Sequence, residues 1–403
     1  MGGLPVRTMR ILYVTSTDLS GATCSPGSVR HVMEVAENLV ARGHRLTLLA
    51  PGVGRYPHPT PVDVRYVPAP KRRYARTLVP EALMPAYLVR HMARADAVYW
   101  RQAFLTAWPA LAARAAGKPL VCEVNGLTED EVYTEDIPAL RRSVVLHLEK
   151  VNYRLADRLI CVAPAIRDRI LKSHPLNPDR VHVILNGVNA NRMPVVDPAE
   201  AKAKVGVPPD APVAGFVGHF FPWDGIETLI AAAPRVLEKF PRTRFLVVGS
   251  GPWGEHLPGL ARETGVGANF VFPGRIAWEE LYWWVNAFDA ACAPYARSIN
   301  TRSGRSSLKI LEYFACQKPV VASRTTVIPE VADIEQKGLG LVVPPEDPEA
   351  LAEALIDLFS HPEKRAAMGR GGREYVERER GWDKVAEKTE AVLRKALADK
   401  GRA

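Results

Sequence analysis

The sequence predicts an α/β protein composed of two doubly wound domains, each built on a parallel sheet. Three observations support this fold class. The chain has 403 residues, whereas single hydrophobic cores stop growing at about 250–300 residues. Short apolar runs alternate with segments of helical periodicity, which is typical of βαβ units. A polar stretch containing proline and alanine, 191–211, interrupts this alternation, which then starts again.

The first half of the chain contains short apolar runs that we interpret as strands. The first helix between them begins at Ser28, places Val32 and Leu39 on one face, and ends at Gly43. Because alternating strands and helices imply a parallel sheet, residues 1–190 are expected to form a Rossmann-like domain. Its strands are expected at 10–15, 45–49, 62–67, 97–100, 120–124, 158–162 and 181–185.

The second half repeats the pattern after the polar stretch, which we interpret as a linker. Residues 212–375 are expected to form a second Rossmann-like domain, and 376–403 a charged helix that packs back on the N-terminal domain through Trp382. Two such domains are expected to face each other across a cleft between the carboxyl ends of their sheets, where doubly wound folds bind ligands. The strands of the second domain are expected at 213–217, 245–248, 269–272, 290–293, 319–322 and 340–343.

The composition indicates a soluble globular protein, because 47% of the residues are hydrophobic and 24% are charged. The five cysteines form no C-x-x-C pair, so we expect reduced core thiols in a cytosolic protein rather than disulfides or a zinc site. No apolar run approaches the ~20 residues that cross a bilayer. The stretch 11–19 is too short and too polar for a signal sequence. A cytoplasmic location is therefore expected.

A formal net charge of +9 favours an acidic partner, such as nucleotide phosphates, anionic lipid or nucleic acid. Nucleic acid is the weakest of the three, because no zinc-finger spacing and no RRM signature occurs. Basic and apolar residues alternate over 71–94, and this segment either contacts an anionic membrane peripherally, at its inner face, or is a solvated helix face. The basic residues are Lys71, Arg72, Arg73, Arg76, Arg90 and Arg94, and the apolar ones are Leu78, Leu83, Met84, Tyr87 and Leu88.

The segment Thr301–Ser323 combines features of a phosphate site with those of a sugar site. Arg302 and Arg305 stand in a hydroxyl-rich loop that leads into a predicted helix over 308–315. A serine-capped helix N-terminus with two arginines suits a phosphate. Glu312, one to two turns inside the helix, is then within reach of the hydroxyls of an attached sugar. An ordinary capped helix with a solvated glutamate is the alternative from local sequence alone.

Two further loops have the composition of phosphate-binding loops. Residues 25–28 open the first predicted helix and form either a second anion site or a simple N-cap. Residues 249–254 match G-x-G-x-x-G, the pattern of dinucleotide sites. However, Pro252 lies inside the turn, and the next strand ends in Pro273-Gly274-Arg275 instead of the acidic residue that binds a ribose. We favour a tight turn, and an NAD-dependent oxidoreductase is the alternative that rests on this motif.

Several short motifs lie in a fixed order over both halves of the chain. The strongest is Ser307–Tyr313 (SLKILEY) followed by Lys318–Ser323 (KPVVAS). The others are 9–16 (MRILYVTS), 27–32 (GSVRHV), 42–44 (RGH), 183–189 (VILNGVN), 215–218 (GFVG) and 247–252 (VVGSGP). In order and spacing they resemble the retaining GT-B glycosyltransferases of family four, the glycosyl transferases group 1, over essentially the whole chain.

This resemblance implies that the C-terminal half binds a nucleotide-sugar donor. Glu312 matches the second glutamate of the family's E-x7-E pattern, which holds the ribose hydroxyls, and the base is expected to lie against the loop 274–276. Gly27 matches the glycine that lets an N-terminal loop approach the diphosphate. The donor-binding residues implied in this way are Gly27, Gly218, His219, Gly274, Arg275, Ile276, Ser306, Ser307, Leu308 and Glu312.

The resemblance further implies that the N-terminal half binds the acceptor. Glu123 and Asn125 lie at the family's acceptor-side motif and are the predicted acceptor residues. The predicted catalytic residues are Asn125, Arg305 and Lys309. His31, His44 and His182 are isolated histidines that we interpret as structural, and no cluster of histidine, cysteine and carboxylate indicates a metal.

The sequence departs from the family pattern at the diphosphate. The first E-x7-E glutamate falls on Gly304, and the arginine and lysine that usually clamp the diphosphate fall near His219 and Asp224. An aspartate repels a pyrophosphate. The residues that we expect to supply the displaced positive charge are Arg302, Arg305 and Lys309.

The resemblance thus implies a retaining hexosyltransferase that is metal-independent and needs no cofactor besides its nucleotide-sugar co-substrate, with UDP-sugar favoured. Transfer is expected in polysaccharide, lipid-linked glycan or glycoconjugate biosynthesis. The sequence of the loops expected to bind the acceptor does not indicate which acceptor is used. A catalytically degenerate protein of the same fold that binds a partner is one alternative, supported by Gly304, His219 and Asp224. A nucleotide-sugar epimerase is another.

Overall fold

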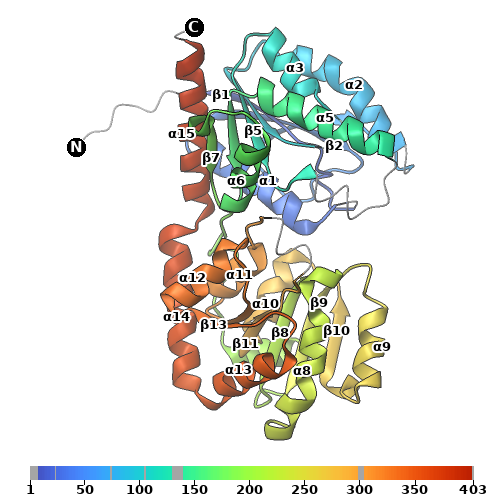
Figure 1. Cartoon of the computed structure of the whole chain (residues 1–403), viewed down its shortest axis with the longest axis vertical. Helices are drawn as coiled ribbons and strands as arrows, with labels where there is room; N and C mark the ends of the chain where they lie inside the picture. Colours follow the sequence, from blue (N-terminus) through green and yellow to red (C-terminus); the bar gives the residue numbers. More distant parts are fainter. Residues whose placement is uncertain are drawn as a thin grey trace, which may run out of the picture. The chain divides into compact units, whose positions relative to one another are not determined.

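The computed structural model describes residues 8–22, 24–72, 75–103, 106–128, 139–297 and 304–401. The chain forms two compact units (Figure 1). The first unit contains the residues up to Asn186 together with those from Trp382 onward, and the second unit contains Gly187–Gly381. The chain therefore passes from one unit to the other twice.

The first unit is built on a seven-stranded sheet with the order β3-β2-β1-β4-β5-β6-β7, in which all neighbours run parallel. The central strands are almost wholly buried, as expected for a parallel sheet covered on both faces. Its strands are β1 (Arg10–Val14), β2 (Arg45–Gly52), β3 (Asp63–Pro68), β4 (Ala97–Arg101), β5 (Leu120–Val124), β6 (Arg158–Cys161) and β7 (Val181–Val183).

Helices pack on this sheet in two recognisable groups. Helices α2, α3 and α5 lie side by side, and α15 packs against α1 (Figure 1). Trp382 begins α15 and is only 2% exposed, while Arg42 after α1 donates a 2.5 Å hydrogen bond to Glu390 of α15. The helices of the first unit are α1 (Pro26–Ala41), α2 (Ala75–Met92), α3 (Trp108–Ala115), α5 (Ala139–Leu155), α6 (Pro164–Ser173) and α15 (Trp382–Lys400).

The second unit is built on a six-stranded parallel sheet with the order β10-β9-β8-β11-β12-β13. Its strands are β8 (Val213–His219), β9 (Arg244–Ser250), β10 (Phe270–Gly274), β11 (Ala290–Ala293), β12 (Val320–Ser323) and β13 (Gly340–Val343). Its helices are α7 (Pro198–Lys204), α8 (Ile226–Lys239), α9 (His256–Glu263), α10 (Leu281–Asn286), α11 (Leu308–Ala315), α12 (Pro329–Lys337), α13 (Pro348–Ser360) and α14 (Pro362–Glu379).

In both sheets the chain order reverses at one point, between β1 and β4 in the first sheet and between β8 and β11 in the second. At such a reversal the loops that follow the two neighbouring strands leave in opposite directions. A crevice therefore opens at the carboxyl ends, where open α/β sheets bind ligands. The second reversal places the loops after β8 and β11 next to each other.

The structure corrects two details of the expected organisation. The stretch 191–211 contains α7 and belongs to the second unit, because buried Lys202 donates to the Ala211 carbonyl and forms a 2.7 Å ion pair with Asp289. The first helix begins at Pro26 rather than Ser28, because the Ser25 hydroxyl accepts the backbone N–H of Ser28. This arrangement is an ordinary N-cap.

Candidate active site

Helix α11 follows β11 in the chain and leads to β12, and β11 is one of the two strands that flank the reversal point of the second sheet. Its apolar face is fully buried, and Tyr313 fixes the helix to the sheet by accepting a 2.8 Å hydrogen bond from the Val217 N–H of β8. Glu312 is 5% exposed and is therefore not the solvated glutamate of the alternative interpretation.

A carboxylate from α12, rather than a serine side chain, holds the start of α11. Glu330 accepts the Ser307 N–H at 2.9 Å and the Ser306 hydroxyl at 2.6 Å. The Ser307 hydroxyl instead lies 2.7 Å from the Tyr295 hydroxyl. Arg380 pairs with the same buried Glu330. The prediction of a serine-capped helix was wrong, because the more strongly accepting carboxylate takes the first N–H.

Lys309 forms an ion pair with Asp224 inside this site. Its Nζ lies 2.7 Å from Asp224 Oδ1, and both side chains are largely buried. Burial lowers the pKa of Lys309, and the charge of Asp224 partly offsets that shift. Lys309 also lies over the ring of Phe216, 4.2 Å from its centroid. The aspartate that we expected to repel a diphosphate therefore cancels the charge of one residue that we expected to hold it.

Arg305 is the other described member of the predicted basic set. Its guanidinium lies over the Tyr295 ring, 5.2 Å from the ring centroid. The backbone N–H of Arg305 donates a hydrogen bond to the Val327 carbonyl. Arg302 lies outside the described residues. Gly304, which stands where the family has a glutamate, is buried immediately before Arg305. The predicted catalytic roles of Arg305 and Lys309 stay predictions.

The loop after β8 reaches the same place from the other side of the reversal point. His219 ends β8, and burial lowers its pKa, which a nearby Asp224 partly offsets. The rings of Phe221 and Trp223 stack at 4.3 Å, and the Trp223 carbonyl accepts the Ala296 N–H. Gly218 has a φ of +158°, and a Cβ at this residue would lie 2.8 Å from Nζ at the flexible end of Lys309.

The G-x-G-x-x-G motif forms a tight turn after β9. The chain at Phe220 packs so closely that a Cβ on Gly251 would lie 2.5 Å from the Phe220 nitrogen, and one on Gly249 would lie 1.8 Å from the Gly218 carbonyl oxygen. Glycine is needed here for backbone contact within the protein. The predicted base-binding residues Gly274, Arg275 and Ile276 lie at the end of β10, two strands away from β8 on the same edge.

In the first unit, Glu123 at the end of β5 is the centre of a buried polar cluster. His31 Nε2 lies 2.8 Å from Glu123 Oε1, Arg101 Nε lies 3.5 Å from it, and Asn125 donates a 2.6 Å hydrogen bond. The Tyr99 hydroxyl donates to the other carboxylate oxygen. Burial alone would raise the pKa of Glu123, but these partners, led by His31, lower it to about 2.

The sequence interpretation missed most of this cluster. His31 was interpreted as an isolated structural histidine, yet it contacts Glu123. Its Nδ1 also lies 2.9 Å from Asn186 Oδ1, within hydrogen-bond distance, and its ring packs edge-on against Trp382. Arg101 stands directly opposite Glu123 in the parallel register, and that pairing was available only once the strand order was known. Asn125 is held by Glu123, so Glu123 orients its neighbour rather than facing open solvent.

Among the residues that the structure describes, no group of three or more histidine, cysteine, aspartate or glutamate side chains could hold a metal ion. No helix in the described part of the chain is long and apolar enough to cross a membrane.

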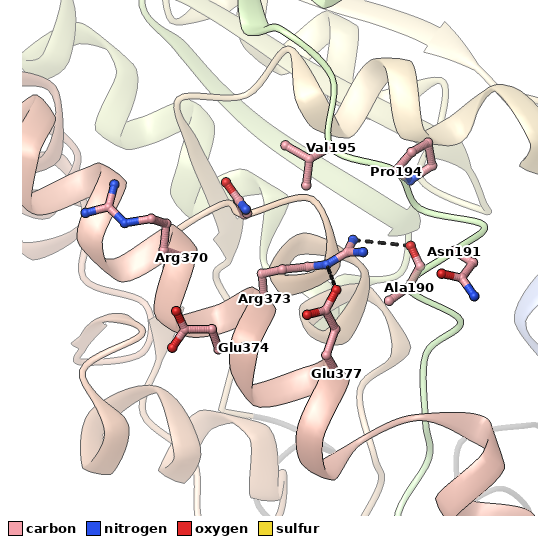
Figure 2. A pocket seen from close by; sticks show the side chains of 9 residues that line it. Ala190, Asn191, Pro194, Val195, Arg370, Arg373, Glu374 and Glu377 are labelled. Atoms are coloured by element: carbon pink, nitrogen blue, oxygen red, sulfur yellow. Dashed lines mark hydrogen bonds and ion pairs between the residues drawn. The ribbon is translucent and has the colours of Figure 1, made fainter.

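A hollow of about 520 Å³ lies in the second unit, between α14 and the segment 190–195 (Figure 2). Arg373 of α14 reaches across it, forms a 2.5 Å ion pair with Glu377, and donates to the carbonyls of Ala190, Met193 and Ala315. One guanidinium thus ties the start of the second unit to the end of α11. We interpret this hollow as structural support.

Comparison with known proteins identifies the family. A model of glycosyl transferases group 1 matches residues 211–361, and a model of glycosyltransferase family 4 matches residues 26–192. A D-inositol 3-phosphate glycosyltransferase from Saccharomonospora viridis is 32% identical over 294 residues, which cover 70% of this chain and 66% of the relative. A GDP-mannose-dependent monoacylated α-(1-6)-phosphatidylinositol monomannoside mannosyltransferase from Corynebacterium glutamicum is 30% identical over 290 residues, which cover 70% of this chain and 71% of the relative.

Solved structures share the fold at low identity. A sucrose-phosphate synthase from Thermosynechococcus elongatus covers 97% of this chain and all of its own, with a TM-score of 0.77 and 21% identity. The Anabaena protein HepE in complex with UDP-glucose covers 97% of this chain and all of its own, with a TM-score of 0.72 and 17% identity. The fold is that of the GT-B glycosyltransferases, and the chain belongs to glycosyltransferase family 4.

Proposed function

We propose that this protein is a glycosyltransferase that moves a hexosyl group from a nucleoside-diphosphate sugar to an acceptor hydroxyl in glycan or glycolipid biosynthesis. The observation that carries the proposal is the place of α11, which follows a strand at the reversal point of the second sheet, with Arg305 just before it, the buried Glu312 within it and Glu330 holding its start. This is where a doubly wound domain binds a nucleotide. Family membership supports the same reading.

The proposed chemistry rests on electrostatics rather than on a nucleophile. Glycosyl transfer passes through an oxocarbenium-like state, so negative charge develops on the departing diphosphate. Arg305 and the N-terminus of α11 stabilise that charge, and the Lys309–Asp224 pair keeps its own charges balanced beside it. Asn125, held by Glu123, orients the acceptor. Retention of configuration and independence from metal belong to this proposal.

For the donor we favour a UDP-sugar, with a GDP-sugar as the competing choice. HepE was solved with UDP-glucose and UDP, whereas one relative is named as GDP-mannose-dependent. The base is proposed to lie against Gly274, Arg275 and Ile276 at the end of β10, with Glu312 on the ribose hydroxyls. For the acceptor, two relatives are named for inositol-containing substrates, and a hydroxyl-rich acceptor is proposed here too.

Activity is tested by incubating the protein with UDP-glucose, UDP-GlcNAc, GDP-mannose and ADP-glucose and measuring release of the free nucleotide. We expect release from one nucleotide family, and a loss of about 100-fold or more in Arg305→Ala, because removing one charge-stabilising donor costs 10²–10³ in turnover. Binding of a nucleotide without any release from these donors would favour the catalytically degenerate alternative. Epimerised donor without release would favour the epimerase.

We further propose that the first unit contacts an anionic membrane. Helices α2, α3 and α5 lie side by side and expose large apolar side chains, with Leu78 67%, Val89 73% and Leu140 79% exposed. Exposed basic residues accompany them, namely Arg90, Arg114, Arg141 and Lys150 on the same helices and Arg94 just after α2. Apolar side chains among positive charges suit the interface of an anionic bilayer.

Vesicle co-sedimentation tests this contact. We expect binding to vesicles with anionic lipid, weaker binding at high salt, and weaker binding in the double variant Leu140→Gln/Val144→Gln. The matched control is Val195→Gln in the second unit, since Val195 is as exposed as Val144, both at 45%. Equal binding to neutral and anionic vesicles, or no difference between these variants, would contradict the proposed contact.

A further inference from the structure

The first unit contains a pocket of about 270 Å³ at the carboxyl ends of its central strands. The floor comes from Val14 and Thr15 after β1, Pro51 of β2 and Trp100 of β4. Helix α2 forms one wall through its own side chains, which are Arg76, Pro80, Glu81 and Met84. The position is the reversal point of the first sheet, and the volume is near the lower end for small-molecule sites, about 300 Å³.

Glu81 is the unusual residue of this pocket. Its Oε2 is shielded from solvent and has no hydrogen-bond partner in the described part of the chain. Burial raises the pKa of Glu81, and the Thr106 hydroxyl, also in the lining, partly offsets that shift. A buried carboxylate oxygen left unpaired costs free energy. Among the described residues no group satisfies this oxygen, so a hydroxyl donor from a ligand is the natural partner.

Arg76 supplies the opposite charge. It stands one turn before Glu81 on α2, lines the same pocket, and makes no ion pair with any described residue. A guanidinium in this position suits a phosphate or carboxylate. Pro80, Met84 and Trp100 offer apolar walls for the C–H faces of a ring, and Asp18, Thr15, Ser16 and Thr106 make the rest of the lining partly polar.

The helix that carries both groups is shaped by two prolines. Pro80 and Pro85 lie inside α2. Because proline has no backbone N–H, Pro80 leaves the carbonyl of Arg76 without its helical hydrogen bond, and Pro85 does the same to the carbonyl of Glu81. Proline inside a helix costs about 3 kcal/mol. The sequence thus loosens the helix at Arg76 and Glu81, which are two of the three charged residues in the lining, the third being Asp18.

We propose that this pocket binds the acceptor, and that Glu81 and Arg76 select a hydroxylated ring or chain bearing one anionic group. Glu81 accepts a hydroxyl of the acceptor, and Arg76 binds its anionic group. The inference rests on the proposed transferase function and adds the acceptor class. Such a group occurs both in free sugar or polyol phosphates and in the head group of a phospholipid, and the outer side of α2, where Leu78 and Val89 are exposed, is compatible with either source.

Calorimetric titration of the full chain, with its nucleotide present, tests the proposal. The probes are inositol phosphate, glucose 6-phosphate and glycerol 3-phosphate, with unphosphorylated inositol and inorganic phosphate as partial ligands. We expect at least one phosphorylated polyol to bind more tightly than either partial ligand. Glu81→Gln and Arg76→Gln should each weaken that binding about tenfold, since each removes one charged hydrogen bond. Arg154→Gln, the same change on α5 outside the pocket, should bind as wild type.

The outcomes separate this inference from the proposed function. Unchanged binding in Glu81→Gln and Arg76→Gln, binding of inorganic phosphate as tight as that of every polyol phosphate, or no polyol binding beside normal nucleotide binding would each overturn the pocket proposal alone. Absence of nucleotide binding would instead contradict the transferase. Vesicles containing phosphatidylinositol provide the second arm. Co-sedimentation that depends on Glu81 supports a lipid head group, and polyol phosphate binding without it supports a free acceptor.

A purely structural role for Glu81 gives a different result. In that case Glu81→Gln changes the melting temperature of the protein without ligand and leaves the affinity for the probes intact, which would overturn the proposal. We expect the reverse: a melting temperature equal to or above that of wild type, because an unpaired carboxylate is removed, together with weaker binding of the polyol phosphate.

Discussion

At the residue scale, Glu123 shows how a buried charge is kept ionised. Four side chains from two elements and one loop contact its two oxygens, and its pKa falls to about 2 despite burial. Because the folded pKa is lower than the unfolded one, Glu123 stabilises the fold above about pH 4.5, and this contribution is lost as the pH falls towards 2.

Replacing Glu123 tests the direction in which its contribution to stability changes with pH. Glu123→Gln should lower the free energy of unfolding at pH 7 by about 3 kcal/mol, because it leaves His31 and Arg101 without their buried partner. The difference from wild type should shrink as the pH falls from 5 to 2, as followed by denaturant titration at each pH. The control is Glu387→Gln, an exposed carboxylate of α15 paired with Lys384 at 3.9 Å. A gap that stays constant with pH would contradict this account.

At the scale of the element, the start of α11 is held by groups that are far away in sequence. Glu330 of α12 accepts two hydrogen bonds from it, and Arg380 pairs with Glu330 just before the chain leaves the second unit. The sequence predicted the helix over 308–315 with the right bounds, but the carboxylate that caps it lies 23 residues further on. Local sequence contains no sign of such a contact.

We predict that Glu330→Gln raises the KM for the nucleotide sugar about tenfold or more, since small misplacements of a binding group have large effects. The matched control is Asp289→Asn, which breaks the buried Lys202 ion pair at the opposite, amino-terminal end of β11. Both variants should lose stability, but only the first should lose affinity for the donor. Equal donor KM values in two equally destabilised variants would show that Glu330 has no positioning role.

At the scale of the whole molecule, the fold could be predicted from the sequence, but the side-chain contacts of the site could not. All thirteen expected strands are present, because buried parallel strands are short apolar runs between helices. The Lys309–Asp224 pair joins residues 85 positions apart, and His31 meets Glu123 only after the sheet has formed. Such pairings depend on strand order and register, which composition and periodicity do not contain. The motif at Gly249–Gly254 was correctly predicted to be a turn, since Pro252 and the missing acid are local signals.

We propose that the second unit binds a ribonucleoside diphosphate and recognises its ribose hydroxyls through Glu312. The most direct measurement is a set of dissociation constants for UDP, GDP and the corresponding 2′-deoxynucleotide, on wild type and on Glu312→Gln. We predict that wild type binds one ribonucleotide about tenfold more tightly than its deoxy form, as expected for one charge-assisted hydrogen bond, and that Glu312→Gln binds both forms equally. An equal preference for the ribose hydroxyl in both proteins, or no nucleotide binding at all, would contradict the account.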